Sequence, residues 1–141
     1  MNFITKKFDE LTVRELYEIV RARQEIFIIE QRIICREFDE VDPESLHCFL
    51  EEGGRIAAYL RAYRDGEGIH IGRVLSVRHG EGLGRRLMEL SLPEVRRAFG
   101  EGEITLHSQC QAEGFYEKMG FKTCSEVFLE EGIEHVTMKM S

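Results

Sequence analysis

The chain has 141 residues, of which 43% are hydrophobic and 32% charged, and a formal net charge of −7 at pH 7. This length predicts one domain over residues 1–141, large enough to bury about 70% of the surface of the unfolded chain. The acidic excess argues against nucleic acid as the main partner, and without an apolar run of roughly 18 to 20 residues or a signal-peptide core we expect a cytoplasmic protein with no membrane partner.

A short strand-like segment, residues 2–8, precedes a helix that we expect from about residue 13 to 30. Thr12 and Glu15 have the spacing of a capping box, which satisfies backbone donors at a helix start. Apolar residues then recur at helical spacing and predict one buried stripe. The stripe consists of Leu16, Ile19, Val20, Ile26 and Phe27.

The stretch that follows this helix, residues 35–45, has neither a helical nor a strand period and is predicted to be a loop. Its carboxylates are Glu37, Asp39, Glu40, Asp42 and Glu44. Such a loop attracts a cationic ligand if its charges are free. An ordinary solvated loop has the same composition, and the sequence leaves both interpretations open.

Three strands are expected next, at residues 45–52, 55–63 and 69–77, joined by a Gly-Gly turn and an Asp-Gly-Glu-Gly turn into an antiparallel meander. A helix over residues 82–100 follows. We expect Pro93 to kink or end this helix partway, and Gly100 to be its natural stop.

A strand at 103–109 follows this helix, so it should run parallel to strand 69–77 in a βαβ unit. A short helix at 111–120 and two strands, at 121–129 and 135–140 around a turn at 130–134, complete the chain. The order of elements predicts an α/β (α+β) fold, a mixed sheet with helices on its faces.

The four cysteines are scattered and form no C-x-x-C pair, so neither a disulfide framework nor a zinc site is indicated. We predict free thiols at Cys35, Cys48, Cys110 and Cys124. Two His and Cys pairs, His47 with Cys48 and His107 with Cys110, are interpreted as packed or hydrogen-bonded core residues rather than as metal ligands. No metal is expected.

Residues 78–88, RHGEGLGRRLM, place Gly80, Gly82 and Gly84 between a strand and the first turn of a helix. Backbone N–H groups there have no intrahelical partner, and glycines let them approach a ligand closely, which makes an anion nest. The segment from Arg73 to Arg97 contains six arginines and only three acidic residues, so the nest lies in a small basic region of the sequence. Phosphate is the expected occupant. A tight strand-to-helix turn is the structural alternative, although one glycine would serve that purpose.

Two other phosphate loops do not fit. A Walker loop requires a lysine and a hydroxyl after its last glycine, and neither follows Gly84. A dinucleotide-binding fingerprint requires glycine where Arg85 stands and usually follows the first strand of a fold.

An ordered set of phrases resembles the GNAT superfamily of N-acetyltransferases. The phrases are RVLSV at 73–77, HGEGLG at 79–84 and QCQAEGFYEKMGF at 109–121. The phrases LYEIVRARQEIFIIEQ at 16–31 and EVFLEEGIEHVTM at 126–138 further resemble the ElaA-like branch, so the likeness spans nearly the whole chain. It implies a mostly antiparallel sheet of about six to seven strands flanked by helices, whose parallel fourth and fifth strands splay apart.

The resemblance implies transfer of the acetyl group of acetyl-CoA to a primary amine, small or peptidic, by direct attack in a ternary complex. It also leaves room for a homodimer. A non-catalytic acyl-CoA-binding or regulatory domain on the same scaffold is the alternative. The residues that it assigns to the coenzyme are Val74, Leu75, Ser76, His79, Gly80, Glu81, Gly82, Leu83, Gly84, Arg85, Gln109 and Phe115.

Tyr116 matches the tyrosine that points at the coenzyme sulfur in this family, so the resemblance implies that it protonates the leaving thiolate. A core role like that of Phe115 is the structural alternative. For the general base we name His70, which strand alternation places on the same face as Gly72 and Val74, with a buried structural histidine as an equal alternative. The other candidates are Glu30, Asp39, Asp42, His47, His107 and His135.

The sequence departs from the family pattern at His79, where Arg or Gln is usual, at Gln109, where Asn is usual, and in a shorter loop between Val77 and Gly80. His79 gives a prediction. If its imidazolium contacts the pyrophosphate, affinity for the coenzyme weakens between about pH 6 and 8 as the ring loses its charge. Calorimetric titrations across this range should show a flatter profile for His79→Gln. An unchanged profile in that variant would remove His79 from the phosphate site.

Overall fold

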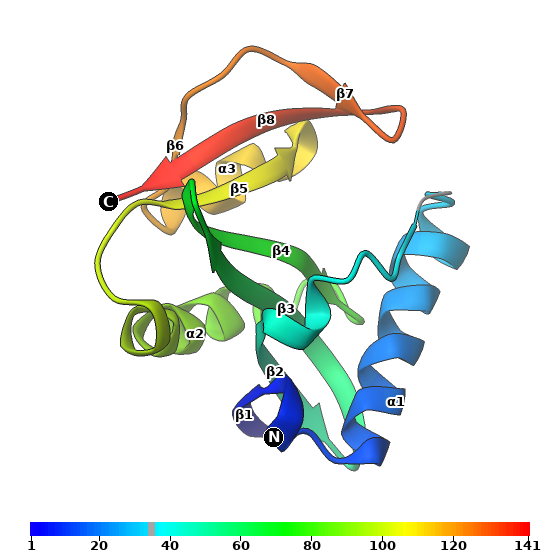
Figure 1. Cartoon of the computed structure of the whole chain (residues 1–141). Coiled ribbons are helices and arrows are strands. Elements are labelled where there is room, and N and C mark those ends of the chain that lie inside the picture. The colour runs from blue at the N-terminus through cyan, green and yellow to red at the C-terminus, as the bar shows by residue number, and fades with distance from the viewer. Residues whose placement is uncertain (34–35) are drawn as a thin grey trace.

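The computed structural model describes residues 1–33 and 36–141, whose eight strands join one sheet in the order β1-β2-β3-β4-β5-β8-β6, with β7 also paired to β8. Helix α1 lies on one face of the sheet, and α2 and α3 lie on the other (Figure 1). The strands are β1 Asn2–Lys7, β2 Leu46–Glu52, β3 Arg55–Asp65, β4 Gly68–Ser76, β5 Ile104–Gln109, β6 Lys122–Thr123, β7 Phe128–Glu130 and β8 Ile133–Met140. The α-helices are α1 Val13–Arg23, α2 Leu83–Phe99 and α3 Glu113–Lys118.

The first helix begins at the predicted cap. The Glu15 N–H donates to Thr12 Oγ1 at 3.0 Å, and the Thr12 N–H donates to Glu15 Oε1 at 2.9 Å, which confirms the capping box. Helical structure extends to Glu30 as expected, but residues Gln24–Glu30 form a π-helix rather than α-helix. The period of the apolar stripe did not reveal this wider turn, which frequently occurs at functional sites.

The predicted meander is confirmed, because β2, β3 and β4 pair antiparallel in chain order, and β1 joins β2 in the same way. The parallel pairing of β4 with β5 is also confirmed, but it covers only two residue pairs, Ile69 with Ile104 and His70 with Thr105. Beyond His70 the two strands diverge, as Figure 1 shows. The sheet is therefore open in its middle.

A bulge in β4 changes which side chains share a face. The pairing with β3 shifts between Arg61, opposite Gly72, and Tyr59, opposite Leu75, and Arg73 within the bulge has φ of 53°. Val74 consequently packs with the cluster under α2, whereas Leu75 packs with the cluster under α1. The prediction that His70 shares a face with Val74 was wrong, because the extra residue reverses the alternation.

Of the two predicted effects of Pro93, an end to the helix was wrong, because α2 continues through Pro93 to Phe99, and a kink stays a prediction. Proline removes one helical hydrogen bond, but the apolar side of α2 is buried against the sheet, and such packing supplies most of the stability of a helix. Gly100 caps it as predicted, with φ of 80° and its N–H donating to Arg96 O. The strand predicted at 121–129 is instead divided into β6 and β7, which raises the strand count to eight.

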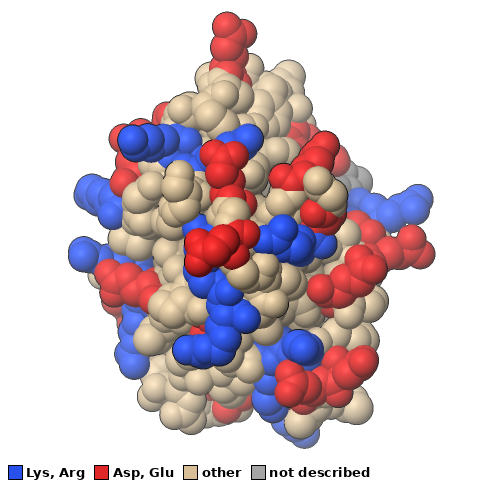
Figure 2. Space-filling model, turned by 60° about the vertical axis from the view of Figure 1, so that its left-hand side comes forward, with Lys and Arg blue, Asp and Glu red and all other residues tan. Residues whose placement is uncertain are grey.

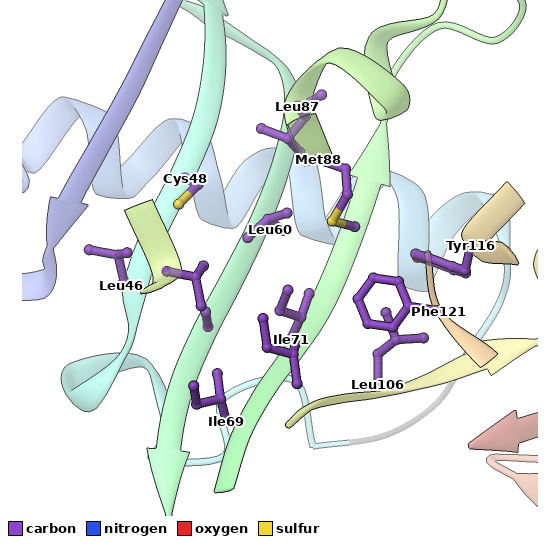
Figure 3. Packing of buried hydrophobic residues seen from close by; sticks show 14 of the residues in the cluster. Leu46, Cys48, Leu60, Ile69, Ile71, Leu87, Met88, Leu106, Tyr116 and Phe121 are labelled. Carbon is purple, nitrogen blue, oxygen red and sulfur yellow. The ribbon is translucent and has the colours of Figure 1, made fainter. Parts of the chain in front are cut away.

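The larger core lies between the sheet and the helices α2 and α3. Figure 3 shows Leu60 and Ile71 of the sheet facing Leu87 and Met88 of α2, with Tyr116 and Phe121 closing the side near β5. The smaller core lies under α1 and includes Ile19, Phe49, Tyr59 and Leu75. Cys48, Cys110 and Cys124 are free thiols as predicted, and Cys35 lies outside the described residues.

Buried arginines hold the acidic loop. Arg23, whose side chain is 2% exposed, donates to Glu37 Oε1 at 2.6 Å and to Asp42 Oδ1 at 2.8 Å. Arg61 donates to Asp39 Oδ2 at 2.6 Å and to Asp42 Oδ1 at 3.0 Å. Burial alone would raise the pKa of Asp39, but the hydrogen bonds and charge of Arg61 outweigh it and lower that pKa to about 2. We call Arg23, Glu37, Asp39, Asp42, Arg61 and Arg73 the ion-pair network.

The network compensates most of the charge of the loop. Arg73 adds a contact of 3.1 Å from its Nε to Glu37 Oε1, so three arginines balance the three carboxylates. His47, 1% exposed, links the loop to β3 by two hydrogen bonds. Its Nε2 lies 3.0 Å from Asp42 O, and its Nδ1 lies 2.7 Å from the Tyr59 hydroxyl. The interpretation of the loop as a free acidic attractant therefore does not hold for these carboxylates.

On the face shown in Figure 2, basic and acidic side chains intermingle over most of the surface. No helix within the described ranges is both long and apolar enough to cross a membrane.

The network gives a stability prediction. Arg23→Met should lower the free energy of unfolding by up to about 3–5 kcal/mol, because Glu37 and Asp42 stay buried and each loses one of its two arginine partners. Arg14→Met is the matched control on the same helix, since Arg14 is exposed and its replacement should cost less than about 1 kcal/mol. Urea denaturation of both variants measures the difference. Equal losses in the two variants would contradict a structural role for the buried pair.

Candidate active site

The glycine stretch forms a tight turn at the start of α2. Gly80 has φ of 78° and Gly82 has φ of 70°, both in the left-handed region that favours glycine. Gly82 is the N-cap of α2, and its carbonyl accepts the first helical hydrogen bond, from the Arg86 N–H at 3.0 Å. The amides of residues 83–85 therefore have no partner inside the helix, and they lie at its positive end. This geometry suits an anion.

Position 84 requires glycine for packing rather than for a left-handed backbone conformation. Gly84 is helical, and a Cβ at this position would lie 3.4 Å from Cζ of Phe115. Its missing side chain lets α3 pack closely against α2. From the sequence, all three glycines were expected to expose backbone amides to a ligand. In the structure, Gly84 instead allows the Phe115 ring to pack against α2.

A cavity of about 380 Å³ lies against this turn. Most of the residues that the sequence assigned to the coenzyme line it: Ser76, His79, Gly80, Gly82, Leu83, Gly84, Arg85 and Phe115. Glu81 and Leu75 do not; Glu81 accepts from Arg78 Nε at 3.0 Å, and Leu75 is buried under α1. Lys118 also lines the cavity and was missed, although it follows Phe115 by three residues on the predicted helix and so shares its face.

The basic side chains near the turn already have acidic neighbours. Arg78 lies 3.4 Å from Glu52 in addition to its bond with Glu81, and Arg85 donates to Glu89 at 2.9 Å. The His79 side chain is 81% exposed, and its Nε2 lies 3.6 Å from Glu30. An anion at this turn therefore meets uncompensated positive charge mainly at the backbone amides and at the helix end.

A second cavity, about 250 Å³, occupies the gap between the diverging strands. We call it the cleft. Residues 71–74 of β4 and 106–109 of β5 form its walls, and Phe27, Gln31 and Glu37 close it from the side of α1. The predicted residues Val74, Gln109 and Tyr116 meet here. Gln109 donates to Gln31 Oε1 at 3.0 Å across one end of the cleft.

Tyr116 lies at the wall of the cleft and is only 8% exposed. The rings of Phe115 and Phe121 meet it edge-on, with centroids 5.1 and 6.0 Å away. Among the described residues none hydrogen-bonds its hydroxyl. Burial raises the pKa of the phenol above its ordinary value, so it keeps its proton at neutral pH. Consecutive residues of α3 thus line two cavities, Phe115 the first and Tyr116 the cleft.

His70 lies elsewhere. It is on the part of β4 that still pairs with β5, its Nε2 is 2.8 Å from Asp65 Oδ1, and its ring stacks on Tyr63 at 5.0 Å. It lines an adjoining outer cavity of about 430 Å³ rather than the cleft beside Tyr116. Asp65, Glu67 and His70 bring three potential ligand atoms within 4.8 Å of one another, an exposed arrangement that is common without an ion.

The other predicted base candidates separate into groups. Asp39 and Asp42 belong to the ion-pair network, His47 is bonded beneath it, and Glu30 faces His79. His107 and His135 line the cleft, on either side of Glu130. Glu130 was not considered, because nothing in its predicted turn signals a partner 23 residues earlier.

Comparisons with known proteins agree with this geometry. Residues 15–141 match the family model described as an acetyltransferase (GNAT) domain. A UPF0039 protein of Schizosaccharomyces pombe is 35% identical over 145 residues, covering 99% of this chain and 97% of that protein. The crystal structure of an acyl-CoA N-acyltransferase from Pseudomonas aeruginosa superimposes with a TM-score of 0.94 at 31% identity, covering all of both chains. Escherichia coli ElaA superimposes with a TM-score of 0.92 at 25% identity, covering 99% of each.

The turn at α2 gives a prediction. Gly82→Ala should lower the affinity for coenzyme A by tenfold or more, because a Cβ disfavours the left-handed conformation that points the amides outward, at a cost of roughly 1–2 kcal/mol. Gly54→Ala is the matched control, since Gly54 has φ of 79° in the β2–β3 turn and a Cβ there would also meet nothing within 4 Å. Isothermal calorimetry and thermal denaturation separate binding from stability. Equal affinity in both variants would show that the turn does not bind the coenzyme.

Proposed function

The chain belongs to the GNAT acetyltransferase family and to its ElaA-like branch, and we propose that it transfers the acetyl group of acetyl-CoA to a primary amine by direct attack in a ternary complex. One observation carries the proposal. An anion-binding turn and an open cleft lie on the two sides of α3, and a buried, protonated phenol lines the cleft.

The turn suits the pyrophosphate of the coenzyme. The amides of residues 83–85 would donate to its oxygens, and Lys118 would add charge from the rim of the cavity. The cavity floor is apolar where Leu83, Phe115 and Met119 line it, which suits the uncharged arm of the coenzyme.

The diverging strands suit the pantetheine arm. Pairing between β4 and β5 stops at His70, so the backbone groups of Val74 to Ser76 on that edge lack a strand partner. Buried backbone donors and acceptors need a partner, and the two amides of pantetheine supply groups of the right kind. The arm would then run along β4 toward the cleft. The assignment of Leu75 rests on its backbone, since its side chain points into the core under α1.

The reaction forms a C–N bond and breaks a C–S bond. The amine nitrogen attacks the thioester carbonyl carbon, and a main-chain amide at the β4 bulge would stabilise the negative charge that develops on the carbonyl oxygen. As the tetrahedral species collapses, the departing sulfur takes the phenolic proton of Tyr116. The amine must lose one proton to a base. The phenol regains its proton from solvent.

The acceptor side consists of the cleft walls on the α1 face. Because the ion-pair network compensates Glu37, Asp39 and Asp42, attraction of a cationic amine would come from Glu130 and Glu131 at the β7–β8 turn, which line the cleft. A small amine or a peptide amine both fit this description, and a homodimer stays a prediction. A purely coenzyme-binding domain would have no use for a proton donor inside the cleft, which favours the enzyme.

Tyr116→Phe tests the proposal. It should lower kcat by about 10²- to 10⁴-fold, the usual contribution of a general acid, while the affinity for coenzyme A stays within a few-fold. Free thiol released from acetyl-CoA in the presence of an amine panel measures turnover. Tyr17→Phe, which alters an exposed tyrosine of α1, serves as the control. Amine-dependent release that survives at full rate in Tyr116→Phe would contradict the assignment, and coenzyme binding without release on any amine would favour the non-catalytic alternative.

A further inference from the structure

Resting on the acetyl transfer proposed above, we propose that His107 is the general base that takes the proton of the acceptor amine, and that Glu130 is a positioning residue that orients it. The two residues face each other across the cleft wall formed by β5 and the β7–β8 hairpin. Both line the cleft that Tyr116 also lines.

The hydrogen bond between them fixes the tautomer of the imidazole. His107 Nδ1 lies 2.8 Å from Glu130 Oε1. An ionised carboxylate only accepts hydrogen bonds, so Nδ1 carries the proton and the neutral ring keeps its lone pair on Nε2. Nε2 is therefore the nitrogen that can receive a proton. This is the arrangement of an oriented general base, in which an acidic group holds the far side of the ring.

Packing holds the ring and the carboxylate in place. The ring of Phe128 meets His107 edge-on with centroids 5.3 Å apart, and Phe128 lies two residues before Glu130 on β7. The second oxygen of Glu130 lies 3.6 Å from Nε2 of His135, a side chain only 7% exposed. His135 Nδ1 donates to Ile133 O at 2.8 Å, so this ring is committed to the hairpin backbone. His135 therefore packs beside the carboxylate without a hydrogen bond to it, and the His107 side chain, 48% exposed, is open to the cleft and to water.

The other candidates are less suited. Nε2 of His70 is taken up by Asp65, and His70 lines only the outer cavity. His107 lines both the outer cavity and the cleft, and it is therefore closer to Tyr116 and the proposed thioester site than His70 is to them by cavity lining. The remaining titratable and charged groups around His107 in these cavities are Arg36, Glu37, Asp39, Arg61, Tyr63, Arg73, Tyr116 and Glu131.

The proton balance closes with these residues. His107 Nε2 takes a proton from the amine as its nitrogen bonds to the carbonyl carbon, and Tyr116 gives a proton to the sulfur as the C–S bond breaks. The imidazolium then returns its proton to water at its exposed edge. No oxidant, reductant or metal is needed, and the net products are the amide and the free thiol.

The first test is the pH dependence of kcat/KM. In the wild-type protein the rate should fall toward acid pH, because a protonated His107 cannot accept the amine proton. His107→Gln should lose about 100-fold or more in rate and follow only the ionisation of the free amine. Glu130→Gln should lower kcat and leave KM nearly unchanged, because the ring loses the hydrogen bond that keeps its proton on Nδ1. Glu134→Gln, which removes the same charge from the other face of the same hairpin, should leave the profile unchanged.

The second test reads the tautomer and does not depend on turnover. Nitrogen-15 NMR of the histidine rings should show the neutral His107 protonated at Nδ1, and this preference should weaken in Glu130→Gln. A His107 protonated at Nε2 would overturn the proposal, as would an acid limb that persists in His107→Gln and disappears in His70→Gln. Absence of transfer to any amine by the wild-type protein would overturn the proposed function itself and the base with it. Transfer with an unchanged acid limb in His107→Gln overturns the base alone.

Discussion

The site depends on a sheet that stops pairing in its middle. After two residue pairs β4 and β5 separate, and the backbone groups on their facing edges lose their partners. In most sheets this would be costly, because buried backbone donors and acceptors nearly always find a partner. Here the separation creates both the cleft and a strand edge that a ligand with amide groups can complete. The same feature that weakens the sheet is the one that makes a binding site available.

Several contacts keep the strands apart. Tyr116 and Phe121 pack beside Leu106 and Ile71 on the α2 and α3 side of the gap, as Figure 3 shows. On the α1 side the ion-pair network joins the loop that contains Glu37 to β3 and β4. Its ion pairs therefore hold Glu37 in place at the cleft. Arg73 joins the two effects, since its backbone forms the bulge and its side chain contacts Glu37. A non-glycine residue with positive φ is strained, and strain of this kind clusters at functional sites.

The sequence predicted best what local chemistry determines. The Thr12 capping box, the turns of the meander and the glycines before α2 each depend on residues a few positions apart, and all were found where expected. The short helix that carries Phe115 and Tyr116 was also found within its predicted range. Features that depend on distant residues were missed. Arg23 meets Glu37 14 residues away, His107 meets Glu130 23 residues away, and Arg73 meets Glu37 36 residues away. A single bulge reversed the face assigned to Val74. Counting alternate residues assumes an unbroken strand, and one inserted residue moves every later side chain to the opposite face.

The proposed coenzyme turn and the cleft differ in whether the backbone or the side chains supply the functional groups. At the turn before α2 the backbone provides the binding groups, and the nearby arginines are already paired with glutamates, so side-chain identity there matters less than the freedom of Gly80 and Gly82 to adopt positive φ. In the cleft the reverse holds, because the proposed proton transfers depend on the side chains of Tyr116 and His107. The proposed acceptor wall comes from the β7–β8 hairpin, which among the described strands pairs with the sheet only through β8. Changes in that hairpin can therefore alter the acceptor without disturbing the coenzyme turn, since α3 and β5 lie between them.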